Sequence, residues 1–148
     1  MDVTHASFTL ERDYAAPVSV VFAAWADAEA RRRWFANGEQ YEQDFRVGGG
    51  EQVRAEQPDG PQLIFTSTYH DIVPDQRIIY TATLATGDEL STVSATTVEF
   101  DATNEGTRLV LTEHGMYLPG QEQPQWREQG TTDQLAGLAT ELGRIAGA

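Results

Sequence analysis

The chain has 148 residues, enough to bury a hydrophobic core, and we expect one domain spanning residues 1–148. Its net charge of −13 argues against binding to the phosphate backbone of nucleic acids or to anionic membranes. Without cysteine or lysine it cannot form disulfides, thiolate metal sites or Schiff bases. It has no signal-peptide pattern and no apolar run of roughly 18 residues, so we expect a cytoplasmic protein.

The N-terminal part predicts one strand followed by two short helices. Residues 3–14 alternate well enough for a strand. Between positions 18 and 25, apolar residues recur at the i, i+3, i+4, i+7 spacing of an amphipathic helix, which Pro17 can open. Asp27 suits the N-cap of a second helix, residues 28–35, which ends before Asn37-Gly38.

From residue 41 the period of the pattern changes to two, which predicts strands. Connections rich in Gly, Pro, Asp and Asn separate the candidates, and such short connections require antiparallel hairpins. The six strand candidates are residues 41–47, 51–56, 63–73, 77–84, 89–100 and 107–115.

The last stretch, residues 124–145, predicts a long helix with one apolar face. Its three glycines make it poor in intrinsic propensity, so packing against the strands must stabilise it. We therefore predict an α+β helix-grip arrangement. A curved antiparallel sheet of six or seven strands wraps around the C-terminal helix, and a cavity remains between them. The predicted apolar face consists of Leu135, Leu138, Ala139, Leu142, Ile145 and Ala146.

Six short motifs follow one another in an order shared with a known family. They are Ala16-Pro17-Val18 with Trp25 and Trp34, the segment 44–49, the segment 69–80, residues 97–100, residues 106–111, and His114-Gly115. The chain resembles helix-grip proteins of the SRPBCC or START-like (Bet v-like) superfamily. It is most similar to the bacterial branch related to the C-terminal domain of the activator of the ninety-kilodalton heat-shock protein ATPase (AHSA-type). One departure is that Thr131 stands where the family often has Trp, and Trp126 is a candidate substitute.

Several possible catalytic or metal sites are not supported by their context. The glycines at 48–50 lie between strands and predict a hairpin or bulge rather than a phosphate cradle. His70-Asp71 and Glu113-His114 are neighbours on strands, so their side chains diverge, and we predict neither a metal nor a cofactor. No serine has the context of a nucleophile. The Arg31–Arg33 cluster predicts a solvated helix face, with a docking patch for an acidic partner as the alternative.

Aromatic and inward polar residues predict a lined cavity. The strand period turns Thr92, Ser94 and Thr96 inward, together with Glu113 on the next strand. A buried Glu113 would have a raised pKa and act as a polar anchor or a general base, unless it lies at a wet rim or pairs with an arginine. Tyr117 and the 118–125 loop, with Met116, are expected to gate the mouth. The predicted ligand-binding set is Trp25, Trp34, Phe65, Tyr69, Tyr80, Thr96, Glu113, Met116, Trp126, Leu135 and Leu138.

The resemblance implies binding of a small hydrophobic molecule, such as a lipid, a polyketide or an aromatic metabolite. Two alternatives remain open: an enzyme similar to polyketide cyclases and aromatases, and a co-chaperone-like stimulator of a heat-shock ATPase. The sequence leaves undecided whether a reaction is catalysed. It also leaves the oligomeric state undecided, with a homodimer as one candidate.

Overall fold

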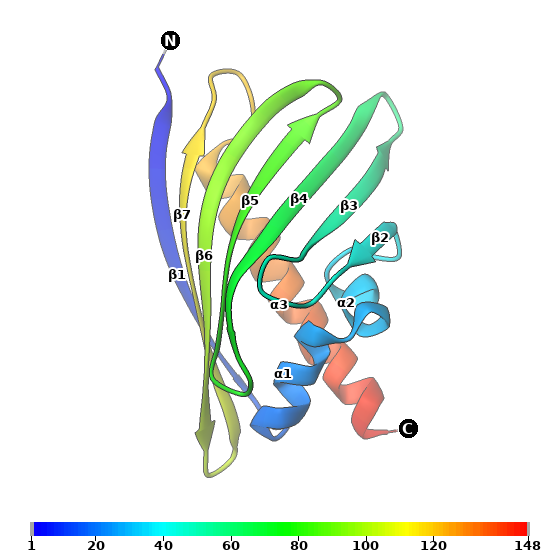
Figure 1. Ribbon diagram of the computed structural model, residues 1–148, viewed down its shortest axis with the longest axis vertical. Helices are drawn as coiled ribbons and strands as arrows, with labels where there is room; N and C mark the ends of the chain where they lie inside the picture. The colour runs from blue at the N-terminus through cyan, green and yellow to red at the C-terminus, as the bar shows by residue number, and fades with distance from the viewer. Residues whose placement is uncertain (1, 148) are drawn as a thin grey trace.

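The structure is a computed structural model that describes residues 2–147 (Figure 1). Within that range seven strands form one antiparallel sheet in the order β1-β7-β6-β5-β4-β3-β2. The predicted α+β helix-grip arrangement is confirmed. The elements are β1 (Thr4–Tyr14), α1 (Val18–Ala26), α2 (Ala28–Trp34), β2 (Gln40–Gln43), β3 (Gly50–Gln57), β4 (Gly60–Val73), β5 (Arg77–Thr86), β6 (Glu89–Thr103), β7 (Gly106–Tyr117) and α3 (Pro124–Ala146).

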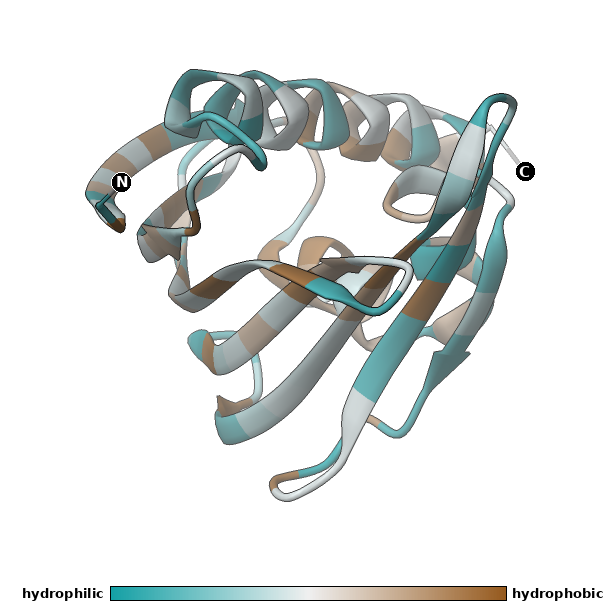
Figure 2. Ribbon diagram, turned by 90° about the horizontal axis from the view of Figure 1, so that it is seen from above, coloured by the Kyte–Doolittle hydropathy of each residue, from teal (hydrophilic) through white to brown (hydrophobic). Residues whose placement is uncertain are grey.

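The long helix α3 lies against one face of the sheet and passes behind it in Figure 1. The view from above shows the sheet curving round one side of this helix (Figure 2). Both α1 and α2 pack on α3. The first strand, β1, pairs with β7 along the whole length of β1. The hydroxyl of Tyr14 donates a 3.0 Å hydrogen bond to the carbonyl of Leu135, which fixes the helix to β1. No helix in residues 2–147 is long and apolar enough to cross a membrane.

The predicted apolar face of α3 is only partly buried. Leu135, Leu138 and Leu142 are buried, but Ala139 and Ala146 are exposed. Thr131 and Glu141 are buried on the same helix instead. Pro124 takes the first helical turn, as its missing N–H favours. The apolar face that the helix buries is therefore narrower than the predicted one, because the two alanines lie outside it.

Near the N-terminus the predicted helix signals are confirmed, with one shift. The side chain of Asp27 caps α2 by accepting a 2.9 Å hydrogen bond from the backbone N–H of Ala30. Pro17 is the N-cap of α1 rather than its first helical residue, and its carbonyl accepts from the N–H groups of Val20 and Val21.

The strand predicted over residues 41–47 is shorter in the structure, because β2 ends at Gln43. The chain then forms a tight loop in which Gly48 has a φ of +88°, a conformation that favours glycine. At Gly50 a Cβ atom would lie 2.0 Å from the carbonyl oxygen of Ser67, so only glycine fits. The glycine run thus serves a close backbone approach between strands.

Candidate functional site: a cavity between the sheet and the N-terminal half of α3

A cavity of about 360 Å³ lies between the first half of α3, the loop after α2, and strands β3, β4, β5 and β7. Its mouth includes two exposed residues, Asn37 after α2 and Gly130 on α3. On the sheet side, half-buried Val53, Leu63 and Leu84 contribute an apolar surface. This volume falls within the roughly 300–1,000 Å³ of small-molecule sites in proteins.

One wall of the cavity consists of aromatic rings from three regions of the chain. Trp25 and Trp34 meet edge to face with ring centroids 4.9 Å apart. Phe35 lies 6.0 Å from Trp34 and 5.4 Å from Phe65, also edge to face. The Nε1 of Trp34 donates to the carbonyl of Ala24, whereas the Nε1 of Trp25 is buried with no hydrogen-bond acceptor in the protein. The wall is therefore rigid and contains one unpaired donor.

A buried ion pair stands behind this aromatic wall. The guanidinium of Arg31 lies 4.5 Å, 4.7 Å and 3.6 Å from the ring centroids of Trp25, Trp34 and Phe35. It donates two hydrogen bonds, of 3.2 Å and 3.1 Å, to the carboxylate of Glu51 on β3. Burial acts to lower the pKa of Arg31, but Glu51 together with three nearby tyrosines outweighs it and the pKa is raised. Arg31 stays charged and holds α2 to the sheet.

The prediction that Arg31–Arg33 forms a solvated helix face is wrong for Arg31, which is 1 % exposed. Arg32 and Arg33 are exposed as predicted, and Arg33 is bound to Glu141 at 2.8 Å. The i, i+3 spacing of Arg31 and Trp34 already placed both on one helix face, and that signal was missed. The docking patch that was the alternative interpretation therefore cannot include Arg31, and Arg33 is already paired with Glu141.

The opposite wall is polar and centres on Arg127, which projects from α3. Its Nη1 donates a 3.0 Å hydrogen bond to Glu113 Oε2, and its Nε donates one of 3.0 Å to Glu122 Oε1. Its Nη2 donates to the hydroxyl of Thr92. The hydroxyl of Thr96 donates to Glu113 Oε1 at 3.0 Å. Two strand residues, Glu113 and Thr92, and Glu122 of the loop before α3 thus converge on a single guanidinium.

Glu113 is the inward carboxylate that the strand period predicted. It is 6 % exposed and paired with an arginine, so the prediction of inward orientation is confirmed and the paired alternative holds. Burial raises the pKa of its carboxyl, although Arg127 and the Thr96 hydrogen bond oppose the shift. Thr92, Ser94 and Thr96 are buried as predicted. This wall combines a carboxyl of raised pKa with spare acceptor capacity.

The structure brings together about half of the residues predicted for the site. Tyr69, Thr96 and Leu138 are buried next to the cavity but do not line it; the Tyr69 hydroxyl accepts a hydrogen bond from Gln43 instead. Met116 and Trp126 are 43 % and 59 % exposed and do not line it either. The predicted residues that do line it are Trp25, Trp34, Phe65, Tyr80, Glu113 and Leu135.

Several lining residues were not predicted. Arg127, Thr131 and Gln134 belong to the first turns of α3, where the apolar period is absent, so an apolar search passes over them. Their spacing of three or four residues, i to i+4 to i+7, was the available signal. Glu122 lies in the loop that was expected to gate the mouth, and it reaches the cavity wall.

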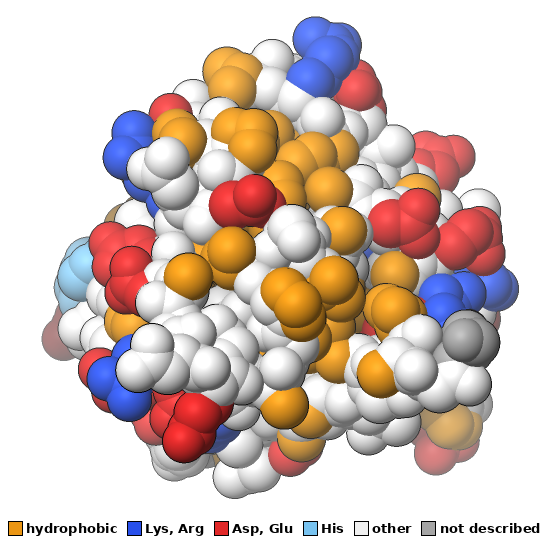
Figure 3. All heavy atoms as spheres, turned by 90° about the horizontal axis from the view of Figure 1, so that it is seen from below, with side chains coloured by type: hydrophobic (Ala, Val, Ile, Leu, Met, Phe, Trp, Pro, Cys, Tyr) orange, Lys and Arg blue, Asp and Glu red, His pale blue; other side chains and the backbone are white. Residues whose placement is uncertain are grey.

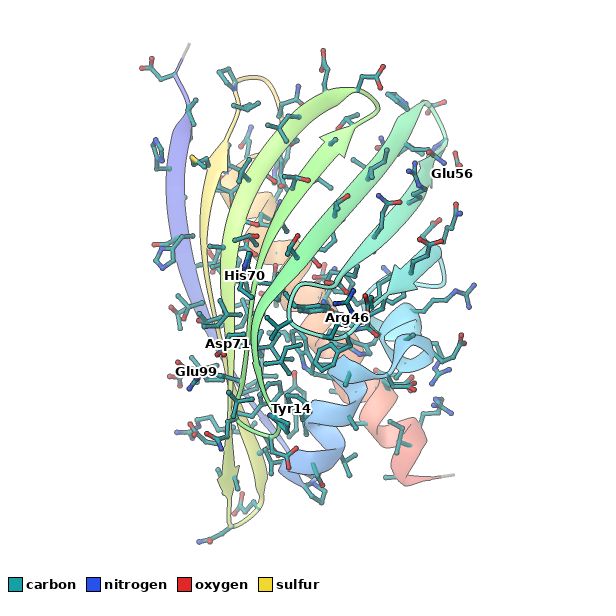
Figure 4. The ribbon with its side chains drawn as sticks, viewed as in Figure 1. Tyr14, Arg46, Glu56, His70, Asp71 and Glu99 are labelled. Atoms are coloured by element: carbon teal, nitrogen blue, oxygen red, sulfur yellow. The ribbon has the colours of Figure 1, made fainter. Side chains whose placement is uncertain are left out.

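The other face of the sheet carries all three histidines as exposed side chains. His70 and Asp71, labelled in Figure 4, both lie on this face with Glu99, so the prediction that this pair diverges is wrong, because a bulge between Tyr69 and Asp71 interrupts the strand period. Glu113 is buried whereas His114 is exposed, so that pair diverges as predicted. Among residues 2–147 no group of three or more His, Asp or Glu side chains is arranged to hold a metal ion. Seen from below, hydrophobic side chains also gather in the middle of the end that carries α1, with charged groups around them (Figure 3).

Comparison with known proteins supports the same fold. The structure superposes on that of an uncharacterised protein from Rhizobium leguminosarum with a TM-score of 0.93, at 39% identity and with 97% of each chain covered. It matches the Mll3558 protein from Rhizobium loti at a TM-score of 0.89 and 40% identity, covering 95% of this chain and 99% of that one.

A more distant similarity in fold alone is to DynU16, a protein of the dynemicin biosynthetic locus. The TM-score is 0.70 at 18% identity, and the match covers 93% of this chain and 47% of that one. Among curated proteins, none matches the chain. The sequence profile of the family described as Activator of Hsp90 ATPase homolog 1-like protein matches residues 15–143. The chain therefore belongs to the Activator of Hsp90 ATPase homolog 1-like protein family.

Proposed function

We propose that this protein binds a small, mostly apolar organic molecule in the cavity beneath the N-terminal half of α3. The observation that carries the proposal is a cavity of about 360 Å³ with aromatic rings on one wall and a charged network on the other. Small-molecule sites have this composition: an apolar lining with few, well-placed polar groups.

A titration with N-phenyl-1-naphthylamine, a neutral probe that fluoresces in apolar surroundings, tests the proposal. We expect saturable binding of one probe per chain. Thr131→Trp places a large ring in the cavity and should abolish the signal, since Thr131 lines it and is 8 % exposed. Thr140→Trp, at an exposed position of the same helix, is the matched control and should bind like the wild type. Equal binding by the two variants, or no binding by the wild type, would contradict the proposal.

A cyclase-like enzyme is the second candidate, and the buried Glu113 carboxyl is the observation that favours it. A carboxyl with a raised pKa at a cavity wall can exchange a proton with a bound substrate. With a candidate polyketide substrate, Glu113→Gln should abolish turnover but leave binding of N-phenyl-1-naphthylamine intact. Unchanged turnover in this variant would remove Glu113 as a catalytic residue.

A further inference from the structure

The charged side chains of the cavity are predominantly acidic. Glu39, Glu113 and Glu122 line it with one cation, Arg127, so the lining carries a net charge of −2 when all four are ionised. The buried Arg31 does not offset this excess, because it stands behind the aromatic wall and is paired with Glu51. The whole chain, with these residues included, carries a net charge of −13, which attracts cations from a distance.

The positive charge of Arg127 is already compensated inside the protein. Each of its three nitrogens donates to a protein oxygen, and two of these oxygens belong to carboxylates on different elements. The hydrogen bonds to Glu113, Glu122 and Thr92 use three of its five N–H groups, so two remain. A ligand carboxylate that reached these two N–H groups would lie beside the carboxylates of Glu113 and Glu122, and their like charges would repel it in a poorly solvated wall.

The acceptor atoms of this wall have more capacity left than its donors. Each oxygen of Glu113 accepts one hydrogen bond, from Thr96 or from Arg127, and a carboxylate oxygen can accept two. Glu122 uses Oε1 for Arg127. The wall therefore offers acceptors to a ligand more readily than donors.

We infer that the cavity selects ligands by charge: it takes an aromatic ring system with a protonated alkylamine group or, less tightly, a neutral arylmethyl alcohol, whose N–H or O–H group meets Glu113, and it excludes aromatic carboxylates. The inference rests on the proposed function, since it names the ligand class for the same cavity. The aromatic wall holds the ring system, and the polar wall distinguishes the head group.

Three probes with the same ring system isolate the head group: 1-naphthylmethylamine, 1-naphthalenemethanol and 1-naphthoic acid. Each is tested by displacement of N-phenyl-1-naphthylamine at pH 7. We expect the amine to displace the probe at the lowest concentration, the alcohol next, and the acid only at a concentration about tenfold or more above the amine. An acid that competes as well as the amine, or displacement by none of the three, would overturn the inference.

Two cavity variants and one control variant show whether the preference for the amine arises in the cavity. Glu113→Gln keeps the shape of the side chain but removes its charge, and the preference for the amine over the acid should fall several-fold. Glu39→Gln, at a half-buried position of the lining outside the Arg127 network, should also reduce the preference. Glu99→Gln makes the same change in net charge on the opposite face of the sheet, where Figure 4 labels it, and should leave the preference unchanged. A preference that survives in both cavity variants, or that falls equally in Glu99→Gln, counts against the inference.

The pH dependence provides a measurement that needs no variant. The groups that face Glu113 are Arg127 from α3, Glu122 from the loop, Tyr80 from β5 and Tyr117 from β7, with the hydroxyl of Thr96. Burial raises the pKa of Tyr80 and of Tyr117 to about 12, so neither titrates near neutrality. Affinity for the amine should therefore fall as pH is lowered through the titration of Glu113, whereas affinity for the alcohol should change little.

The failure of the proposed function and the failure of the charge selection give different results. If N-phenyl-1-naphthylamine itself does not bind, the proposed function is refuted. If it binds but the cavity shows no preference for the amine, only the charge selection is refuted.

Discussion

The two halves of α3 meet the sheet in different ways. The C-terminal half presents Leu138 and Leu142, which are 0% and 6% exposed, to α1, α2 and the sheet. The N-terminal half presents Arg127, Gly130 and Thr131 to a curved sheet of the same kind, and there a cavity remains. The difference lies in side-chain volume: leucines fill the space between helix and sheet in one half, and small or polar side chains leave it open in the other.

Polarity sharpens the same contrast. In the closed half the helix is joined to its neighbours mainly by apolar contacts, and its buried carboxylate Glu141 is bound by two arginines at the surface. In the open half the buried charges of Glu113 and Arg127 border the cavity itself. A molecule that keeps charged groups beside a cavity gives up packing energy there, which is typical of a region shaped for binding rather than for stability.

The aromatic wall between the two halves yields the largest expected effect. Arg31→Met leaves the buried Glu51 carboxylate without its partner and should lower the free energy of unfolding by about 3–5 kcal/mol. Replacing both residues, as in Arg31→Met with Glu51→Met, should recover much of that loss, because no uncompensated charge remains. Urea unfolding of the three proteins measures this.

The corresponding change in the open half serves as the comparison. Arg127→Met should cost less than Arg31→Met, since Glu113 borders the cavity and can take up a proton there. If the Arg31 variant lost no more stability than the Arg127 variant, the distinction between a closed and an open half would not hold for charges.

A second prediction addresses packing alone. Leu138→Ala should cost about 2–5 kcal/mol, because it leaves a void in the closed half that the surroundings cannot fill. Thr131→Ala, seven residues earlier on the same helix, should cost less than about 1 kcal/mol, since its hydroxyl bonds only to the carbonyl of Arg127 in its own helix. Thermal and urea unfolding decide between these values, and equal losses would mean that the cavity is as tightly packed as the core.

The sequence predicted the closed half better than the open one. Regular periods placed the seven strands, the three helices and the inward Glu113, because those patterns reflect local geometry. The partner of Glu113 could not be predicted in this way, since Arg127 reaches it across 14 residues of chain through the loop before α3. Arg31 was misassigned because three adjacent arginines suggest solvent, whereas its contacts come from two tryptophans and a strand residue brought together only by the fold.

Met116 and Trp126 were misplaced for a related reason. Their apolar character suggested cavity lining, but Met116 follows Gly115 on β7 with the parity of the outer face, and Trp126 lies on the exposed side of α3. Side-chain orientation on a strand alternates strictly, so applying the period of two to Met116, as was done for Glu113, would have assigned it correctly.

The smallest expected effect concerns the ion pairs of Glu141 near the C-terminal end of α3. Hydrogen bonds from Arg33 and Arg144 lower the pKa of Glu141 to about 2. A carboxyl whose pKa is lower in the folded state than in the unfolded state, where it is about 4.3, stabilises the fold above that unfolded value. This contribution is lost as pH falls from about 4.3 towards 2.

Because Arg33 and Arg144 are 40% and 53% exposed, solvent screens these pairs and we expect Glu141→Gln to lose only about 1 kcal/mol at pH 7. The loss should shrink between pH 4.3 and 2, where the wild-type carboxyl also becomes neutral. Glu128→Gln, at an exposed position of the same helix, is the matched control and should follow the wild type at every pH. A difference between Glu141→Gln and the wild type that stayed constant down to pH 2 would show that Glu141 stabilises the closed half by packing and not by charge.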